Sequence, residues 1–510
     1  MSEARAEEPS RVLPLWLQLA LWAIAAAIVA AWLALAVIHV NDEYRVTHYQ
    51  GVWIAVAEEA REGRLYPPAF DGEHYAGTRY MPLPILLNAF ATKVIGDPLA
   101  GGKVLAAVLM ASLLALVFFT LRWSFCPPAL AGALAAVVVA TDTGLQAGSA
   151  IGGDLLPLVL QIGALAIVVR CRGRVASLIA GGLAGLAIAS KLTGGWAWLA
   201  IVTWYVMQRK WRSAATFSMA CAATAALVLG TVQLLTGGGL SEHLLAFSTA
   251  GVQGSLSILR GPNQILFNLL GHASATVVLV PLAAIGMLLR DGWRRLSVVH
   301  LALVYAVVLL LGVYADVGTG PNQLLDVVVL TTLAAGLLAS RAAALHPPIG
   351  RIAVQAVAVT VIWAAGLDLV RTVGFDLRGS VSAITAGASP RRDVAAVVRM
   401  VQPGEEVLAE DPSIDVALGR RPIVMDPFMV MALERRRPQE VDPLISWISN
   451  QRFDLVVLVV SLEDRDVDYW WSDFHFGARV AKALRTSYVF DRHVGRYFAY
   501  RRLQRSRETQ

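Results

Sequence analysis

Residues 12–44 read VLPLWLQLALWAIAAAIVAAWLALAVIHVNDEY, and this stretch decides the fold. The segment from Val12 to Val40 contains no Asp, Glu, Lys or Arg. It is longer than the roughly 20 residues that a membrane-spanning helix requires. Asp42 and Glu43 follow directly at its end. Carboxylates at the edge of a membrane are costly to bury, so this pair is a candidate reaction site; the alternative is a solvated helix end.

The composition of the whole chain indicates a polytopic membrane protein. Of the 510 residues, 56% are hydrophobic and only 16% are charged, which is too apolar for a soluble globular protein. The net charge of +6 comes from short basic clusters between apolar segments. The positive-inside rule explains such clusters, so they indicate orientation and not nucleic-acid binding. A cleavable signal peptide has a shorter apolar core, so the first segment is expected to remain as an anchor.

About eleven membrane-spanning helices are predicted from the apolar pattern. They lie near residues 14–38, 100–121, 128–147, 154–170, 175–191, 195–208, 213–236, 272–289, 297–315, 323–340 and 350–370. Basic clusters at every second boundary mark the cytoplasmic side. They are Arg122, Arg170 to Arg174, Arg209 to Arg212, Arg290 to Arg295, and Arg341 to Arg351. The three cysteines lie in no predicted external loop, so we expect no disulfide and no zinc site of the cysteine type.

This topology divides the chain into a cytoplasmic tail (1–13), a membrane domain (14–372) and an external C-terminal domain (378–510). The first external loop, 39–98, is expected to hold two amphipathic helices on the membrane surface, near 52–62 and 85–95. In the C-terminal domain, short apolar runs predict strands at 407–409, 422–425 and 454–460. Helical periodicity near 391–401 and 439–450 makes this an extracytoplasmic α/β domain.

The ionisable residues near the membrane gather at one side. Each lies at or near the predicted external end of its helix: Asp42, Glu43, Asp142, Asp154, Lys191, Asp316, Asp326 and Asp368. A secondary transporter is expected to carry its ionisable site near the middle of the bilayer. The pattern therefore favours a reaction site at the outer face of the membrane.

Several short motifs in these loops resemble those of the GT-C membrane glycosyltransferases. They are the Asp42-Glu43 pair, His48 to Gly51, Gly63 to Pro68, Thr78 to Leu83, Gly153 to Leu156, Ser190 to Gly194, and Gly318 to Gln323. In this order they are similar to the branch that contains bacterial aminoarabinose transferases, protein mannosyltransferases and mycobacterial envelope mannosyl- and arabinosyltransferases. The resemblance covers about residues 12–370.

The resemblance implies an inverting transfer of a sugar from a polyprenyl-phosphate donor to an acceptor outside a bacterial plasma membrane. The acceptor, a glycan, lipid or protein hydroxyl, must lose a proton as it attacks, and a carboxylate can accept it. Asp42 is the predicted base. Glu43 is a second candidate carboxylate, with a divalent cation as its alternative partner. Asp154 is expected to hold a sugar hydroxyl, orient a cation or act as the second carboxylate.

The departing lipid phosphate requires cationic or donor side chains aimed at its developing charge. The candidates are Arg79, Lys191 and Arg260, helped by His243 or His74. Tyr80 is placed to stack on a sugar, and Asn322 belongs to the last motif. Lys191, the two arginines and His243 also have ordinary alternatives. Lys191 could extend to the membrane surface from a helix end, Arg79 and Arg260 could be solvated loop charges, and His243 could be a surface histidine.

The predicted transfer reaction requires no cofactor, although a bound Mg²⁺ or Mn²⁺ remains an alternative. The expected partners are the lipid-linked donor, the acceptor and membrane lipids, with no nucleic acid. Two rival functions remain: a transporter or flippase of an envelope lipid, and a scaffold with an inactive transferase core. Mannose, arabinofuranose, aminoarabinose and glucose all remain possible as the transferred sugar, because a few hydroxyl contacts decide such specificity.

Overall fold

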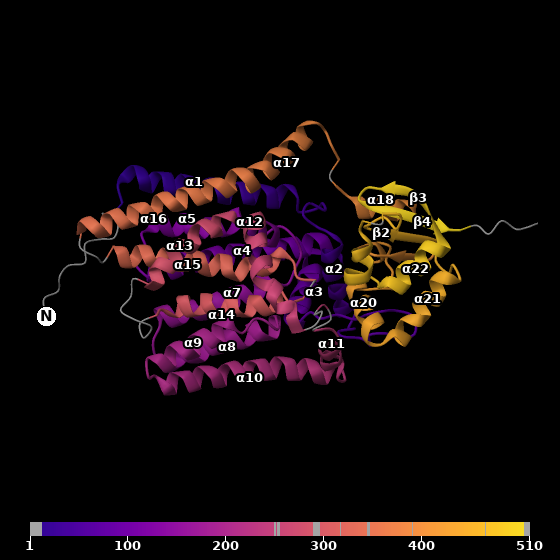
Figure 1. The fold of residues 1–510 in the computed structure, drawn as a ribbon, viewed down its shortest axis with the longest axis horizontal. Helices are drawn as coiled ribbons and strands as arrows, with labels where there is room; N and C mark the ends of the chain where they lie inside the picture. Colours follow the sequence, from indigo (N-terminus) through magenta and orange to yellow (C-terminus); the bar gives the residue numbers. More distant parts are fainter. Residues whose placement is uncertain are drawn as a thin grey trace, which may run out of the picture.

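The computed structural model describes residues 13–248, 251, 255–288, 296–316, 318–343, 347–389, 391–464 and 466–503. These residues form a long bundle of helices with a smaller α/β domain at one end (Figure 1). The predicted basic cluster at 290–295, most of the cytoplasmic tail and residues 504–510 lie outside the described residues.

Each of the predicted membrane segments contains a helix of the bundle. The helices are α1 (Leu15–Ile38), α4 (Pro98–Trp123), α5 (Pro128–Ala140), α6 (Asp142–Ala147), α7 (Leu155–Arg170), α8 (Arg174–Ser190), α9 (Trp196–Met207), α10 (Trp211–Leu235), α11 (Gly239–Phe247), α12 (Gly261–His272), α13 (Ser274–Leu288), α14 (Val298–Val313), α15 (Leu325–Ala342) and α16 (Pro347–Asp368). Short 3₁₀ turns, η2 (Ser255–Arg260) and η4 (Pro321–Leu324), precede α12 and α15.

Five helical stretches in the described residues are long and apolar enough to cross a membrane. They are Leu15–Ile38, Pro98–Trp123, Trp211–Leu235, Pro321–Ala342 and Pro348–Thr385. A sixth is added if the pair Ser257–His272 and Ser274–Met287, bent by 118°, is one broken span. The remaining apolar helices of the bundle are shorter.

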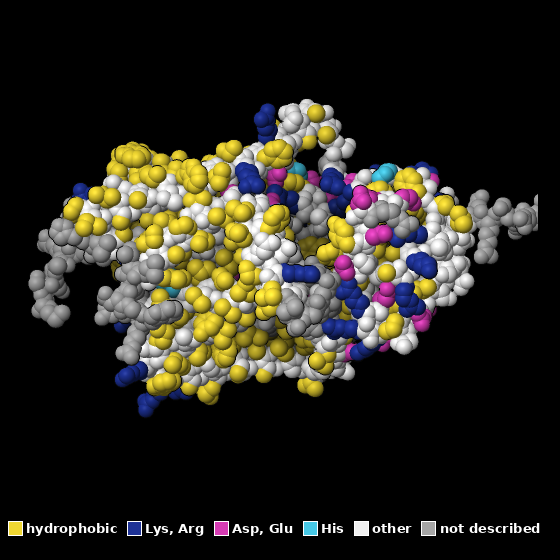
Figure 2. Space-filling model, viewed as in Figure 1, with side chains coloured by type: hydrophobic (Ala, Val, Ile, Leu, Met, Phe, Trp, Pro, Cys, Tyr) yellow, Lys and Arg dark blue, Asp and Glu magenta, His cyan; other side chains and the backbone are white. Residues whose placement is uncertain are grey.

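The packing of the bundle follows from the distribution of apolar residues on each helix. Helix α5 is apolar all round, and it is buried among α1, α4, α15 and α16. Helix α1 buries one stripe and leaves Leu15, Leu19 and Val37 exposed on the other side. A helix that is hydrophobic on both faces suits a border between protein and lipid. Figure 2 shows the flank of the bundle covered with hydrophobic side chains, whereas charged side chains gather over the C-terminal domain.

The first loop contains the two predicted helices, α2 (His48–Arg61) and α3 (Pro82–Ile95). Helix α3 packs on α4 and exposes Leu86, Phe90 and Val94, as a helix at a membrane surface would. Helix α2 differs from the expectation, because its residues 52–57 are buried. It packs against α3 and, in the C-terminal domain, α19 (Ser413–Ala417). Helix α2 therefore belongs to the interface between the two parts of the molecule.

The predicted start of the C-terminal domain, residue 378, lies within a continuous helical stretch. Helix α16 continues through a π-helical turn, η5 (Leu369–Gly374), into α17 (Phe375–Thr385), and the domain's first helix, α18, starts at Asp393. Four strands form one sheet in the order β1-β2-β4-β3, in which β1 and β2 are parallel and the other pairs antiparallel. The strands are β1 (Val407–Ala409), β2 (Leu455–Leu458), β3 (Tyr488–Val494) and β4 (Tyr497–Arg502). The helices are α18 (Asp393–Met400), α19, α20 (Pro427–Arg436), η6 (Pro438–Val441), α21 (Asp442–Ser449), η7 (Trp470–Phe474) and α22 (Ala478–Ser487).

One predicted strand has a different partner from the one expected. Residues 422–425 lie outside the sheet, and Val424 forms an isolated bridge with Tyr75 of the first loop. The Tyr75 N–H donates to the Ile423 carbonyl, and the Met425 N–H donates to the Tyr75 carbonyl, both at 2.8 Å. These backbone bonds join the first loop to the C-terminal domain. Strands β3 and β4 were not predicted from the sequence.

Candidate active site

The end of the bundle next to the C-terminal domain contains a cavity of about 470 Å³, here called the inner cavity. The first loop, the start of α7, the end of α8 and the segment before α15 all contribute to it. Its polar lining residues include Tyr49, Arg79, Tyr80, Asp154, Lys191, Thr193, Asp316, Thr319 and Asn322. Five residues predicted or expected to bind substrate or take part in the chemistry are therefore brought together: Arg79, Tyr80, Asp154, Lys191 and Asn322.

Asp154, Lys191 and Asn322 form a hydrogen-bonded group in the inner cavity. Asp154 precedes α7, Lys191 ends α8, and Asn322 lies in η4. The Lys191 ammonium lies 2.8 Å from Asp154 Oδ1, and the Asn322 amide donates to Asp154 Oδ2 at 2.7 Å. The ion pair is largely shielded from solvent, with side chains 19% and 16% exposed. Three segments that are distant in sequence thus place one carboxylate, one cation and one amide together.

Arg79 adds a second cation to the inner cavity. Its guanidinium donates to Asp316 Oδ2 at 3.0 Å and lies 4.4 Å from the centre of the Phe428 ring in α20. Asp316 is one of the ionisable residues noted at the predicted external helix ends. Its pairing with Arg79 joins positions 237 residues apart, which no local pattern predicts. Tyr80 stacks on Trp53 of α2, with ring centres 4.1 Å apart, so one face of Tyr80 is occupied by protein.

A second cavity, of about 310 Å³, adjoins the inner one and is here called the outer cavity. It lies between α2, the segment 318–322 and the C-terminal domain. Its lining includes His48, Tyr49, Arg79, Tyr80, Gln146, Asn322, Asp426, Phe428, Trp470, Phe474 and His475. Tyr49, Arg79, Tyr80 and Asn322 line both cavities. The C-terminal domain therefore supplies one wall of a compartment whose other wall is built on the membrane domain.

Asp42, the predicted base, lies outside both cavities. It is 6% exposed, with His39 Nδ1 2.6 Å from its Oδ2 and the Tyr44 N–H donating to its Oδ1 at 2.9 Å. Lys103 of α4 donates to the backbone carbonyls of His39, Asp42 and Tyr44. Burial raises the pKa of Asp42, but the bonds from His39 and Tyr44 outweigh it, and the pKa lies below its ordinary value. The surroundings of Asp42 are those of a carboxylate that orders the loop after α1.

Glu43, the neighbouring carboxylate, points to the C-terminal domain. The Val394 N–H at the start of α18 donates to Glu43 at 2.8 Å, and Arg496 lies 3.5 Å away. Arg496 also pairs with Asp411, the second residue after β1, at 3.1 Å. Burial raises the pKa of the Glu43 carboxyl. Glu43 therefore connects the first loop to the soluble domain, at a separate cavity of about 670 Å³.

The other predicted phosphate ligands lie elsewhere. His243 is buried, with Nε2 2.7 Å from the Pro67 carbonyl and Nδ1 accepting from the Thr78 N–H at 3.3 Å, so both ring nitrogens are used within the protein. Burial lowers the pKa of His243. His74 lies 3.2 Å from Arg421 of the C-terminal domain. Arg260 is exposed at the end of η2 and does not line the inner or the outer cavity.

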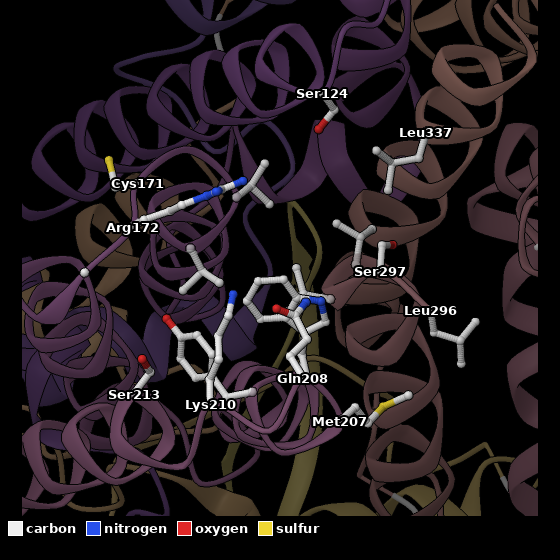
Figure 3. Close-up of a pocket in the computed structure, with 17 residues that line it drawn as sticks. Ser124, Cys171, Arg172, Met207, Gln208, Lys210, Ser213, Leu296, Ser297 and Leu337 are labelled. Carbon is white, nitrogen blue, oxygen red and sulfur yellow. The ribbon is translucent and has the colours of Figure 1, made fainter. Parts of the chain in front are cut away.

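A further cavity of about 670 Å³ lies at the opposite end of the bundle (Figure 3). Arg172 and Lys210 extend into it, and Lys210 lies over the Trp204 ring, 5.3 Å from its centre. Its described lining contains serines, Gln208 and Tyr205 but no carboxylate and no imidazole. A sugar transfer needs a group that can accept a proton. The inner and outer cavities contain such groups, so they are the better candidates for the reaction site.

The carboxylates of these cavities are possible metal ligands by residue type. In the part of the chain that the structure describes, no three His, Cys, Asp or Glu side chains are grouped as ligands of one ion. In the inner cavity, Asp154 is already bound to Lys191 and Asn322. In the described part of the chain the Asp154 carboxylate is thus engaged within the protein, and independence of metal remains a prediction.

Comparison with known proteins identifies structural relatives. No family model and no curated protein matches the chain by sequence. The structure of ArnT from Cupriavidus metallidurans bound to undecaprenyl phosphate superposes with a TM-score of 0.59 at 13% identity, covering 96% of this chain and 99% of ArnT. The oligosaccharyltransferase AglB from Archaeoglobus fulgidus, in complex with an inhibitory peptide and a dolichol phosphate, gives a TM-score of 0.53 at 13% identity, covering 94% and 74%. Another structure of the archaeal enzyme contains Zn and sulfate.

These matches confirm the GT-C fold that the sequence motifs suggested. The superposition with ArnT extends over nearly the whole of both chains. At 13% identity the likeness establishes the fold, and the chemistry must be argued from the residues of this chain.

Proposed function

We propose that this protein is an inverting glycosyltransferase that moves a sugar from a polyprenyl-phosphate carrier to an acceptor hydroxyl at the extracytoplasmic face of a bacterial plasma membrane. The observation that carries the proposal is the inner cavity, where Lys191 and Arg79 place two cations beside Asp154 and Asn322. The structural neighbours support the substrate class, because they contain undecaprenyl phosphate and dolichol phosphate.

The two cations suit the departing group of this reaction. As the bond from the sugar to the phosphate breaks, negative charge develops on the lipid phosphate. Lys191 and Arg79, each held by a carboxylate in a partly shielded cavity, can stabilise that charge without reorganising. Arginine offers a planar, forked set of donors that matches phosphate oxygens. In this proposal Asp154 and Asn322 orient Lys191 and contact sugar hydroxyls.

The expected orientation follows from the charges at the two ends of the bundle. The end remote from the C-terminal domain carries Arg122, Arg170, Arg172, Arg174, Arg209, Lys210 and Arg212. The positive-inside rule places this end in the cytoplasm, and the reaction site and the C-terminal domain outside. With α1 as the first of about eleven spans, the acceptor would approach from the external side.

The two rival functions differ from a transferase in one measurable outcome. A transporter or flippase would move the lipid without breaking a bond, and a scaffold would bind a partner without turnover. The inner cavity favours the transferase because its ionisable groups form a cluster at one end of the bundle. A transporter is expected to place such a site near the bilayer midplane.

The test is release of free polyprenyl phosphate from purified protein in nanodiscs. Donors carrying mannose, arabinofuranose, aminoarabinose or glucose would be offered with crude envelope glycans as acceptors, with and without EDTA. We expect the wild type to release the lipid phosphate from at least one donor. Turnover that persists in EDTA would confirm independence of metal. Absence of release with every donor would contradict the transferase and leave the transporter and the scaffold.

Replacement of Lys191 by Met is expected to lower kcat by roughly 10²–10³-fold, because one stabilising cation is removed from the developing phosphate charge. The matched control is Lys482→Met on the exposed side of α22, which should retain wild-type turnover. Unchanged kcat in Lys191→Met would show that Lys191 is only a helix-end residue.

A further inference from the structure

We propose that the outer cavity binds a carbohydrate acceptor and that His48, not Asp42, accepts the proton of its attacking hydroxyl. This inference rests on the proposed function and assigns the acceptor side of the same reaction. It follows from the position of His48, the first residue of α2. His48 belongs to the first loop and lines the outer cavity together with residues of the C-terminal domain.

The side chain of His48 is held in place, yet its ring nitrogens make no hydrogen bond to any described residue. A capping box between Thr47 and Gln50 fixes the start of α2 and so the direction of His48. Its ring contacts Trp470 and His475 edge-on, at centroid distances of 5.4 and 4.8 Å. In the described residues, no hydrogen bond or ion pair involves a ring nitrogen of His48. A half-buried polar group without a protein partner is available to a ligand.

The opposite wall of the outer cavity is held by hydrogen bonds to one buried carboxylate. Glu410 is fully buried after β1, and its Oε1 lies 2.5 Å from His475 Nδ1 and accepts from Trp470 Nε1 at 2.7 Å. Its other oxygen accepts from the Val459 N–H at 2.7 Å. Glu410 therefore holds the two rings that face His48, and their orientation does not depend on the acceptor.

The wall chemistry indicates a sugar as the acceptor. Trp470, Phe474 and Phe428 offer apolar ring surface to the outer cavity, while His48, Gln146 and Asp426 offer polar atoms. A ligand that fits both needs an apolar face and hydroxyl groups at its edge, and a sugar ring has this character. The C-terminal domain contributes Asp426, Phe428, Trp470, Phe474 and His475 to this lining, and its polar groups suit a glycan better than an acyl chain.

The charges around His48 keep its imidazole neutral. Burial lowers the pKa of His48 well below its ordinary value, and the neighbouring His475 and Arg496 lower it further. Arg79, from the first loop, lies on the other side of the cavity, and Asp426 is the carboxylate on this lining. A neutral imidazole is the form that can take a proton.

The carboxylate on this lining, Asp426, and the base predicted from the sequence, Asp42, are both already engaged. Asp426 caps α20 by accepting the Phe428 N–H at 3.0 Å. Asp42 lines neither cavity and is bonded to His39 and to the Tyr44 N–H. His48 has no comparable structural bond, so its nitrogen is free to act without unfolding a cap or a loop.

The proton and electrons balance in a single displacement. The acceptor O–H proton moves to a ring nitrogen of His48 while the oxygen forms a bond to the anomeric carbon. The bond from that carbon to the phosphate oxygen breaks on the opposite face, and the lipid phosphate leaves with the electron pair. Lys191 and Arg79 lie on the leaving-group side, in the inner cavity, and His48 lies on the acceptor side.

The experiment measures the pH dependence of polyprenyl phosphate release for the full chain in nanodiscs. The acceptor probes are a panel of alkyl glycosides. The variants are His48→Gln, His48→Asp, Asp42→Asn and Asp426→Asn, with His493→Gln on the exposed face of β3 as the matched control. Binding of undecaprenyl phosphate, measured by its thermal shift, reports whether each variant is folded and retains its donor site.

We expect His48→Gln to lose roughly 10²–10⁴-fold in kcat with an unchanged thermal shift, because only proton transfer is removed. The wild type should lose activity only at a pH below 6.5, the ordinary histidine pKa, as the imidazole becomes protonated. This acid limb should be absent in His48→Gln, and His48→Asp should recover part of the rate.

Wild-type rates in His48→Gln, or an acid limb that persists in it, would overturn the assignment. A full loss in Asp42→Asn or Asp426→Asn, together with an active His48→Gln, would move the base to that carboxylate. If the wild type turns over no donor at all, the proposed function itself fails and the role of His48 fails with it. If the lipid phosphate is released equally fast when water replaces the alkyl glycosides, the outer cavity is not a carbohydrate site. The assignment of His48 as the base would not be affected by that result.

Discussion

At the scale of single residues, Lys103 shows how one side chain orders the loop beside the reaction site. It is 5% exposed in α4, and its ammonium donates to three backbone carbonyls of residues 39–44 and lies 3.7 Å from Asp42. Lys103→Met should destabilise the fold by about 1–3 kcal/mol, because buried carbonyls lose their donor. Thermal unfolding in detergent measures this loss, and Lys93→Met, exposed on α3, is the control.

Asp42 contacts Lys103 in the same loop, and its pKa predicts how the stability of the fold depends on pH. Its folded-state pKa lies below 3.8, so its stabilising effect is complete above that value and is lost as the pH falls through the lower, folded pKa. Asp42→Asn should therefore lower the unfolding temperature at neutral pH and make stability less sensitive to acid. A variant with unchanged stability and lost turnover would instead support Asp42 as the catalytic base.

At the scale of elements, the approach of α2 to the start of α7 shapes the inner cavity. Gly153 has no side chain, and the Trp53 ring occupies the position that a Cβ there would take. The Trp53 ring in turn stacks on the Tyr80 ring, which lines the inner cavity. Gly153→Ala should therefore displace Trp53, cost about 1–3 kcal/mol and lower turnover, since overpacking forces neighbours to shift.

The adjacent glycine is a matched control for this change. A Cβ at Gly152 would meet no atom within 4 Å, and its backbone conformation is one that alanine adopts. Gly152→Ala should leave stability and turnover unchanged. Thermal unfolding and lipid phosphate release measure both variants, and equal behaviour of the two would show that the contact between α2 and α7 does not shape the cavity.

At the scale of the whole molecule, the two ends of the bundle are predicted to lie on opposite sides of the membrane. Cys171 is exposed between α7 and α8, at the basic end, whereas Cys126 and Cys221 are buried. In intact cells a membrane-impermeant maleimide should leave Cys171 unlabelled and should label a cysteine introduced by Lys482→Cys in the C-terminal domain. Permeabilised cells should label both. Labelling of Cys171 in intact cells would contradict the orientation.

The sequence by itself determined the membrane class, the places of the bundle helices and several residues of the inner cavity. Ionisable residues at the ends of apolar segments are conspicuous because each is costly there, so Asp154 and Lys191 could be selected without a structure. Arg79 was selected from the Thr78 to Leu83 motif of the first loop. Helix positions followed from local apolar patterns. The continuation of α16 through η5 into α17 was not predicted, because the sequence FDLRGSVSAIT of α17 is more polar than that of α16.

Only the tertiary structure decided which of the candidate residues meet. Arg79 reaches Asp316, Tyr75 pairs with Val424, and His48 faces His475 because loops distant in sequence pack against each other. Such contacts depend on how α2 is enclosed between the bundle and the C-terminal domain, and no local pattern contains that information. For the same reason the sequence selected Asp42 by its place after α1, while the fold turned it toward His39 and placed His48 at the cavity.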